Sequence, residues 1–328
     1  MIIVTGGAGF IGSNLLGALE AAGAADLVVC DQLLSGNKWR NIAKRSLRDI
    51  VTPDAILAYI DTHAGQIETI FHLGAISSTT ATDGDEVVKA NFSFSVALWQ
   101  ACARHGIAFI YASSAAAYGD GAHGFTDSND LAAHRRLRPL NLYGWSKWLF
   151  DGWVLQSVER GLATPAKWAG LRFFNVFGPN EYHKGTMQSL VAKIVTGHVP
   201  GVPVRLFKSY RADFADGWQL RDFIAVDDVI AAMLWLDDRP GSAGILNLGT
   251  GVARSFHDLA VAAVQACGDR PVIEYADMPQ PLRSAYQYYT CADMRRLRGL
   301  GYDRPFTPLE DAVTRYAQDY LLAPDRYR

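Results

Sequence analysis

The first fourteen residues constrain the fold of this chain more than any other stretch. They read MIIVTGGAGFIGSN, a short β-branched run that ends in glycines and continues as apolar residues at helical spacing. Gly6, Gly9 and Gly12 form a G-x-x-G-x-x-G motif, and Gly7, Gly9 and Gly12 also form G-x-G-x-x-G. Such glycines permit a tight turn, a close approach to a pyrophosphate and close helix packing. The stretch predicts a strand, turn and helix that bind a dinucleotide.

Strand and helix patterns alternate through about the first 175 residues. Strand patterns are DLVVCD, TIFHLGA, AFIYASS and AGLRFFNV, separated by helical patterns such as VVKANFSFSVALWQACARHG. This alternation predicts an α/β fold, a Rossmann-type doubly wound parallel sheet. Beyond residue 178 the pattern becomes irregular, but DFIAVDDVIAAMLWLDD and AGILNLGTG indicate a return to the sheet. We expect an NADP-binding Rossmann domain of residues 1–175 plus about 222–250. A smaller mixed α/β substrate-binding lobe is expected from about 176–221 plus 251–328.

Composition narrows the classes of partner. The 328 residues are 49% hydrophobic, which supplies a large core, and the formal net charge is −2. A nearly neutral chain has no global field that attracts nucleic acid or an anionic membrane. The four cysteines lie far apart with no histidine at zinc-site spacing, so no metal is expected. No apolar run reaches the roughly 20 residues of a membrane span, and no secretory signal is visible, so the expected location is cytoplasmic.

The residues after the second strand bear on the choice of cofactor. Asp31 ends this strand at the distance from the glycines where an acid accepts hydrogen bonds from ribose hydroxyls. Taken alone, Asp31 favours NAD. Lys38 and Arg40 follow closely, and a cation there can pair with the 2′-phosphate of NADP. The residues themselves leave NAD and NADP both open.

Three polar residues form a candidate catalytic set. Tyr143 and Lys147 are four residues apart in a helical pattern, which places them on one face. An ammonium beside a phenol is expected to lower the pKa of the phenol and make it a usable acid and base. Ser114 ends the strand AFIYASS, at the edge where such sheets bind ligands. We expect Ser114 and Tyr143 to hold the same substrate oxygen, with neighbouring Tyr118 lining the pocket.

The combination of TGGAGFIG, Asp31, SSAAAYG, YGWSK and RFFNVFGP resembles the extended short-chain dehydrogenase/reductase (NAD-dependent epimerase/dehydratase) family over nearly the whole chain. Members of this family modify nucleotide-activated sugars. FHLGAISSTT, HKGTM, RDFIAVDDV and GYDRPF are similar to motifs of its ADP-heptose 6-epimerase branch. The resemblance implies an isomerase that inverts C6″ of ADP-D-glycero-D-manno-heptose through bound NADP, for the lipopolysaccharide core. It also implies a homo-oligomer, a pentamer in that branch.

The resemblance also implies roles for individual residues. Those matching cofactor-binding positions are Gly6, Gly9, Phe10, Ile11, Gly12, Asp31, Gln32, Lys38, Leu73, Gly74, Ala75, Ile76, Ser77, Asn91, Tyr143, Lys147, Val176 and Lys184. Those matching substrate-binding positions are Ser114, Asn175, Thr186, Lys193, Phe207, Ser209, Arg221 and Tyr286. Ser114, Tyr143 and Lys147 match the catalytic triad, and Lys184 matches a second acid/base. Lys38 is implied to hold the 2′-phosphate, which favours NADP. Two departures stand out: the chain lacks a basic residue near Pro53, and YRADFADGWQL is longer than the usual loop.

Other functions compete with this interpretation. A UDP-sugar 4-epimerase shares most of the motifs but does not require Lys184, whose simplest alternative role is that of a solvated loop lysine. A 4,6-dehydratase needs two acids directly after the catalytic hydroxyl, where this chain has Ala115 and Ala116. A non-catalytic NADP-binding sensor has no use for the Tyr143 and Lys147 pair.

Overall fold

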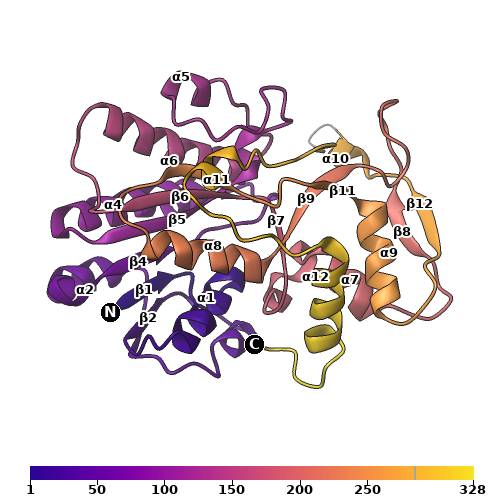
Figure 1. Cartoon of the computed structure of the whole chain (residues 1–328), viewed down its shortest axis with the longest axis horizontal. Coiled ribbons are helices and arrows are strands. Elements are labelled where there is room, and N and C mark those ends of the chain that lie inside the picture. Colours follow the sequence, from indigo (N-terminus) through magenta and orange to yellow (C-terminus); the bar gives the residue numbers. More distant parts are fainter. Residues whose placement is uncertain (284–285) are drawn as a thin grey trace.

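The computed structural model describes residues 1–283 and 286–328. Its larger part is a parallel sheet of seven strands in the order β10-β6-β5-β4-β1-β2-β3 (Figure 1). The strands are β1 (Ile2–Thr5), β2 (Leu27–Cys30), β3 (Asp49–Val51), β4 (Thr69–His72), β5 (Ala108–Ser114), β6 (Trp168–Phe173) and β10 (Gly244–Leu248). The order reverses between β1 and β4, so the carboxyl ends of these strands open a ligand-binding crevice. The predicted Rossmann-type fold class is confirmed.

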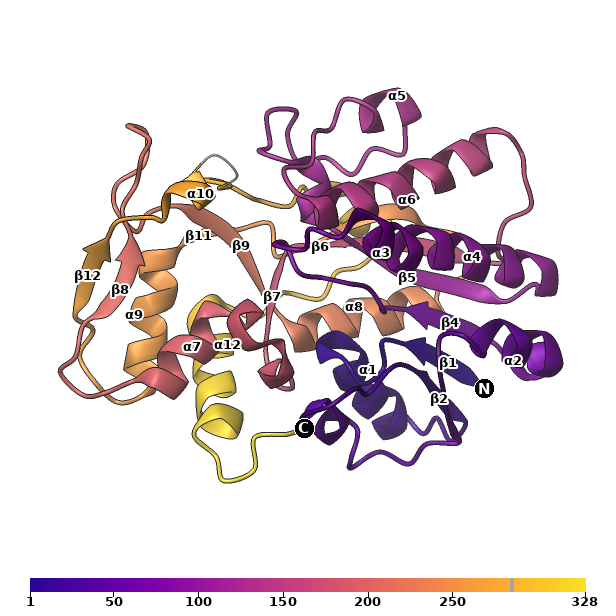
Figure 2. The ribbon, with the colours of Figure 1, turned by 180° about the vertical axis from the view of Figure 1, so that it is seen from behind.

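Helices cover both faces of this sheet, and each strand divides its side chains between them. Val4 and Phe71 belong to the core under α1 (Phe10–Ala21) and α8 (Val226–Asp238). Ile3 and Ile70 belong to the core under α2 (Ile56–His63), α4 (Phe94–His105) and α6 (Leu142–Glu159), seen in front of the sheet in Figure 2. Burial on both faces explains why the strands are continuous apolar runs.

A smaller lobe follows β6. It holds a three-stranded sheet in the order β11-β9-β7 and a parallel pair, β8 with β12. The strands are β7 (Asn175–Phe177), β8 (Val204–Phe207), β9 (Leu220–Ala225), β11 (Ala253–Ser255) and β12 (Ile273–Ala276). Helices α7 (Leu190–Gly197), α9 (Phe256–Ala266) and α12 (Leu309–Tyr316) pack against them around one apolar cluster.

The expected return of the chain to the large sheet is only half correct. Residues 244–248 form β10 beside β6, as the pattern indicated. The segment DFIA instead lies in β9, which pairs with β7 and β11 in the small sheet. The physical reason is that β7 follows β6 almost directly and provides an edge that β9 occupies. The domain boundaries themselves stay a prediction.

Short elements complete the chain. They are η1 (Lys38–Asn41), η2 (Ala64–Gln66), α3 (Gly84–Val88), η3 (Lys89–Ser93), η4 (Ala115–Tyr118), α5 (Leu131–His134), η5 (Tyr182–Met187), α10 (Gln280–Arg283), α11 (Arg295–Gly299) and η6 (Ala317–Leu321). Within residues 1–283 and 286–328, no helix has the length and apolarity needed to cross a membrane.

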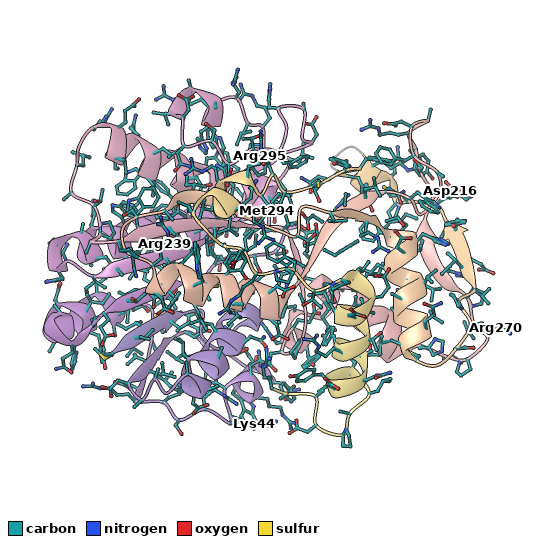
Figure 3. The ribbon with its side chains drawn as sticks, in the orientation of Figure 1. Lys44, Asp216, Arg239, Arg270, Met294 and Arg295 are labelled. Atoms are coloured by element: carbon teal, nitrogen blue, oxygen red, sulfur yellow. The ribbon has the colours of Figure 1, made fainter. Side chains whose placement is uncertain are left out.

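The C-terminal segment ties the two parts together. Lys44, labelled at the lower edge of Figure 3, pairs with Asp325 at 2.7 Å and donates to the Tyr327 carbonyl at 2.6 Å. The Tyr182 hydroxyl donates to the Arg326 carbonyl at 2.7 Å. The segment after α12 therefore fixes η5 beside the nucleotide-binding part.

Candidate active site

A cavity of about 1170 Å³ lies at the carboxyl edge of the large sheet, between it and the small lobe. Most of the predicted site residues line it: Gly6, Gly9, Phe10, Ile11, Gly12, Asp31, Lys38, Leu73, Gly74, Ala75, Ser77, Ser114, Tyr143, Lys147, Asn175, Val176, Lys184, Lys193, Phe207 and Tyr286. The remaining six lie outside its lining: Gln32, Ile76, Asn91, Thr186, Ser209 and Arg221. The cavity thus joins residues from distant parts of the chain.

The glycine turn is built as a cradle for a pyrophosphate. Gly6 has a φ of 66°, and a Cβ there would lie 2.6 Å from Cα of Gly74. A Cβ on Gly9 would lie 2.9 Å from the Gly6 carbonyl oxygen. The Ser13 amide makes the first bond of α1, to the Gly9 carbonyl at 3.1 Å, and no side chain caps the helix. The helix amides before Ser13 remain free to donate to phosphate oxygens. These residues fit a dinucleotide cofactor.

Asp31 and Lys38 form the adjoining end of the cavity. The Asp31 carboxylate accepts from the Ala8 amide at 2.9 Å and from the Gln32 amide at 2.7 Å. The Lys38 ammonium donates to Asp31 at 2.5 Å and to the Gln32 carbonyl at 2.9 Å. An acceptor for ribose hydroxyls and a cation suited to a phosphate therefore stand side by side. Gln32 contributes its backbone to this arrangement.

Asn91 acts on the cavity through its neighbours. It accepts from the Ile76 amide at 2.8 Å and donates to the Ile76 carbonyl at 2.9 Å. It also donates to the Ser146 hydroxyl at 2.9 Å on α6. Asn91 therefore fixes the predicted cofactor loop of residues 73–77 against the helix that carries Tyr143.

Ser114, Tyr143 and Lys147 meet as the sequence predicted. Ser114 ends β5, and it lines the cavity together with Tyr143 and Lys147. Tyr143 and Lys147 lie one turn apart on α6, and the Lys147 ammonium donates to the Ala112 carbonyl at 2.8 Å. A hydroxyl, a phenol and an ammonium at the end of one strand can hold and protonate a substrate oxygen.

Close backbone contact positions this helix. A Cβ on Gly144 would lie 2.7 Å from the Ala116 carbonyl oxygen and 3.1 Å from the Ala116 Cβ, so α6 approaches η4 closely. The Asn141 side chain caps α6 by accepting from the Gly144 amide at 2.8 Å. Tyr143 therefore enters the cavity from the first turn of a fixed helix.

The pKa of the Tyr143 phenol is raised in the protein alone, whereas the sequence predicted that it would be lowered. Burial raises the pKa of Tyr143, and the hydrogen bond from Ser114 opposes this rise. Burial also lowers the pKa of Lys147 to about 8, against the opposing charge of Asp151. The reason for the difference is that the Lys147 ammonium is directed to Ala112, and desolvation outweighs its effect on the phenol.

Lys184 lies over the glycine turn on η5. Its Nζ is 5.4 Å from the centroid of the Phe10 ring. Burial lowers the pKa of Lys184, and Glu181 opposes this change. The preceding His183, whose pKa burial lowers to about 4, contacts the Asn41 amide nitrogen at 3.1 Å. Lys184 is therefore partly buried against Phe10, where desolvation favours the neutral amine.

Arg221 lies behind the substrate end of the cavity. It is 6% exposed, and its guanidinium carbon lies 5.4 Å from the Phe256 ring and 5.3 Å from the Tyr286 ring. It donates to the carbonyls of Leu220, at 2.9 Å, and Gln287. Burial lowers the pKa of Arg221 to about 10. Arg221 therefore reaches the cavity through Tyr286, which lines it.

Two other predicted substrate residues lie apart from the cavity lining. Thr186 is exposed on η5. Ser209 bonds within its own loop, since its amide donates to Asp216 at 2.7 Å and its hydroxyl donates to the Arg211 carbonyl at 2.9 Å. The long loop folds back on itself at the surface, with the Gly217 amide donating to the Phe207 carbonyl at 3.1 Å.

The prediction that Tyr118 lines the pocket is wrong. Tyr118 is 1% exposed, lies outside the cavity lining and donates to the Asn247 side chain at 2.6 Å. The structure also places a charged pair below the site, Asp151 and Arg172, to which the sequence patterns gave no role. The signal for this pair is a charge within each of two apolar runs, LFDGWVL and AGLRFF.

Comparisons with known proteins agree with this geometry. Residues 2–249 match the model of the NAD dependent epimerase/dehydratase family. The ADP-L-glycero-D-manno-heptose-6-epimerase of Nitratidesulfovibrio vulgaris (strain DP4) is 45% identical over 331 residues, covering 100% of both chains.

Two solved structures extend the comparison. The Helicobacter pylori ADP-L-glycero-D-manno-heptose-6-epimerase is 28% identical with a TM-score of 0.77, covering 96% of this chain and 94% of that one. MoeE5, in complex with UDP-glucuronic acid and NAD, is 28% identical with a TM-score of 0.75, covering 96% of this chain and 97% of that one.

Proposed function

Because the chain belongs to the NAD-dependent epimerase/dehydratase family, we propose that it is an isomerase, an ADP-glyceromanno-heptose 6-epimerase. It converts ADP-D-glycero-D-manno-heptose to ADP-L-glycero-D-manno-heptose for the lipopolysaccharide core. The observation that carries the proposal is 45% identity over the full length of an enzyme with this name. The cavity adds support, because it joins a dinucleotide cradle to two separate proton-exchanging groups.

The cofactor in this proposal is NADP. When bound, it would supply the hydride acceptor and donor for C6″, a secondary alcohol carbon that is oxidised to a ketone and reduced again from the other face. The glycine turn holds the pyrophosphate, and Asp31 accepts hydrogen bonds from the adenosine ribose. Lys38, which bonds to Asp31 at 2.5 Å, pairs with the 2′-phosphate and favours NADP over NAD.

The proton chemistry needs two bases because the C6″ hydroxyl occupies a different place before and after inversion. Tyr143 serves one place, and Ser114 orients both the phenol and the substrate oxygen by hydrogen bonding. Lys147 favours the phenolate when Tyr143 has lost its proton. Lys184, on the opposite element η5, serves the other place. Each group acts as base in the oxidation or acid in the reduction.

The small lobe recognises the nucleotide sugar. Tyr286 lines the end of the site that receives the diphosphate, and the buried Arg221 guanidinium supports it from behind, 5.3 Å from the Tyr286 ring. Asn175, Lys193 and Phe207 supply the remaining lining of this end.

We also propose that the protein assembles as a homo-oligomer and acts in the cytoplasm. Sedimentation velocity of the purified protein measures the assembly.

A substrate screen tests the proposed function. Purified protein loaded with NADP is incubated separately with ADP-D-glycero-D-manno-heptose, UDP-glucose and a GDP-hexose, and the products are separated by anion-exchange chromatography and identified by NMR. We expect conversion of the ADP-heptose only. Conversion of UDP-glucose with no reaction of the ADP-heptose would replace the proposal with a 4-epimerase.

A further inference from the structure

A buried carboxylate lies directly beneath the candidate catalytic residues. Asp151 of α6 is 0% exposed, and its three neighbours come from the adjoining strands β5 and β6. Its carboxylate accepts from the Ser113 hydroxyl at 2.8 Å, from the Tyr111 hydroxyl at 3.1 Å and from Nε of Arg172 at 2.9 Å. One side chain therefore joins α6 to two strands of the large sheet.

Asp151 and the β5 residues that it contacts lie next to the candidate catalytic residues. Asp151 lies one helical turn after Lys147, on the same face of α6. On β5, Tyr111 and Ser113 flank Ala112, whose carbonyl accepts from Lys147. The residue after Ser113 is Ser114. Any shift of β5 along α6 would thus change the distance from Ser114 to Tyr143 and the bond made by Lys147.

The buried Arg172 guanidinium, like the Asp151 carboxylate, is surrounded by side chains that interact with its charge. It is 1% exposed, and its Nη2 lies 3.1 Å from Nδ1 of His134. Its guanidinium carbon lies 4.7 Å from the centroid of the Tyr118 ring. A buried ion pair gains little net stability, because the desolvation of two charges offsets their attraction. Stability alone is therefore a weak reason for a pair in this place.

The charges near Lys147 are few among the described residues. The ionisable groups on the elements packed around it are Tyr143 and Asp151 on α6, Tyr111 on β5, Tyr118 on η4, His134 on α5, His72 on β4 and Arg172 on β6. Burial lowers the pKa of His72 to about 3 and that of His134 to about 4, so both are neutral near pH 7. Asp85, Glu86 and Lys89 of α3 and η3 are exposed. The buried charges that remain are Asp151 and Arg172.

We propose, as a refinement that rests on the proposed function, that Asp151 is a positioning residue for the epimerase reaction. Its carboxylate locks the end of β5 against α6 and supplies the negative charge that keeps Lys147 an ammonium. Arg172 pairs with Asp151 at 2.9 Å and holds its carboxylate in place. Neither Asp151 nor Arg172 lines the cavity, so both act through Lys147 and Ser114.

The pH dependence of kcat/KM gives a readout that a purely structural role would not move. Burial lowers the pKa of Lys147 to about 8, and Asp151 opposes that change. Asp151→Asn removes the opposing charge, so the pKa of Lys147 falls further. Activity that needs the ammonium is then lost at lower pH, and the alkaline limb should move down by about one unit or more. An unmoved limb in a folded variant overturns the proposal.

A second variant keeps the test usable if Asp151→Asn does not fold. Asp151→Asn alone leaves Arg172 buried without its counter-ion, a change that strongly destabilises a fold. Asp151→Asn with Arg172→Gln removes both charges and should show the same shift of the limb.

Ser113→Ala keeps both charges, so it should lower kcat about tenfold with the alkaline limb unmoved. If neither Asp151 variant folds, wild-type kcat in Ser113→Ala overturns the proposal. Ser157→Ala, which removes a bond to the Trp153 carbonyl farther along α6, is the matched control and should match wild type.

A measurement without substrate separates this inference from the proposed function. Protein labelled with [13Cε]lysine is titrated by NMR, and the Lys147 signal is identified by its absence in Lys147→Arg. The signal should titrate near pH 8 in the wild type and at lower pH in the double variant. A wild-type protein inactive on ADP-heptose that still shows this shift would overturn the proposed function and retain the role of Asp151. Identical titrations would overturn the role of Asp151.

Discussion

At the scale of single residues, the site depends on how burial tunes groups that titrate far from neutrality in water. Burial raises the pKa of Tyr143 and lowers the pKa of Lys147 to about 8. It lowers the pKa of Lys184 as well. Two amines and one phenol thus stand around a cradle for a dinucleotide, and the proposed inversion needs a proton-exchanging group on each side of C6″.

Lys184 offers the sharpest residue-scale test. Lys184→Met keeps a side chain of similar length against the Phe10 ring but cannot exchange a proton. We expect turnover to fall by about 10²-fold or more, as for loss of a general acid or base. Fluorescence titration should still show NADP binding. The control is Lys89→Met, an exposed lysine, which should retain full turnover. Normal turnover in Lys184→Met would return Lys184 to the role of a loop lysine.

Lys38 tests the choice of cofactor. Lys38→Ala removes the cation bonded to Asp31, so a 2′-phosphate would face that carboxylate without compensation. We expect the dissociation constant for NADP to rise about tenfold or more, in line with the loss of a charge-assisted bond. The constant for NAD should change little. Isothermal titration with each dinucleotide measures both, and equal losses for the two would contradict a role in phosphate recognition.

At the scale of elements, the sequence predicts what depends on local pattern. The glycine turn, β5 ending at Ser114 and the helical spacing of Tyr143 and Lys147 are all found in the structure. The pattern does not predict which sheet a strand joins, because β9 could pair with either sheet and its partner β7 is chosen by tertiary contacts. The Asp151–Arg172 pair escaped prediction for the same reason, since its members lie 21 positions apart on two different elements, α6 and β6.

The contact of α6 with η4 carries an element-scale prediction. Gly144→Ala places a methyl group 2.7 Å from the Ala116 carbonyl oxygen, so the helix that carries Tyr143 must move. We expect a loss of about 1–3 kcal/mol in unfolding free energy, the usual cost of overpacking, together with lower kcat. Gly84→Ala meets no atom within 4 Å and should retain both values. Urea denaturation and steady-state kinetics measure these effects, and unchanged values for Gly144→Ala would show that the contact relaxes freely.

At the scale of the whole molecule, the cavity lies where the large sheet and the small lobe meet. The large sheet supplies the glycine turn, Asp31 and Ser114, and the small lobe supplies Phe207 and Tyr286. The C-terminal segment reinforces the arrangement, because Lys44 and Tyr182 both bond to it. A cofactor held by one part and a sugar nucleotide held by the other would meet at Tyr143.

The central claim is that one hydride leaves C6″ and returns to the same carbon. The decisive measurement is conversion of ADP-D-glycero-D-manno-heptose by the NADP-loaded protein in deuterated water, followed by proton NMR and mass spectrometry. The account predicts ADP-L-glycero-D-manno-heptose that retains hydrogen at C6″. Product that carries deuterium at C6″ would contradict it, because the inversion would then proceed by proton exchange with solvent.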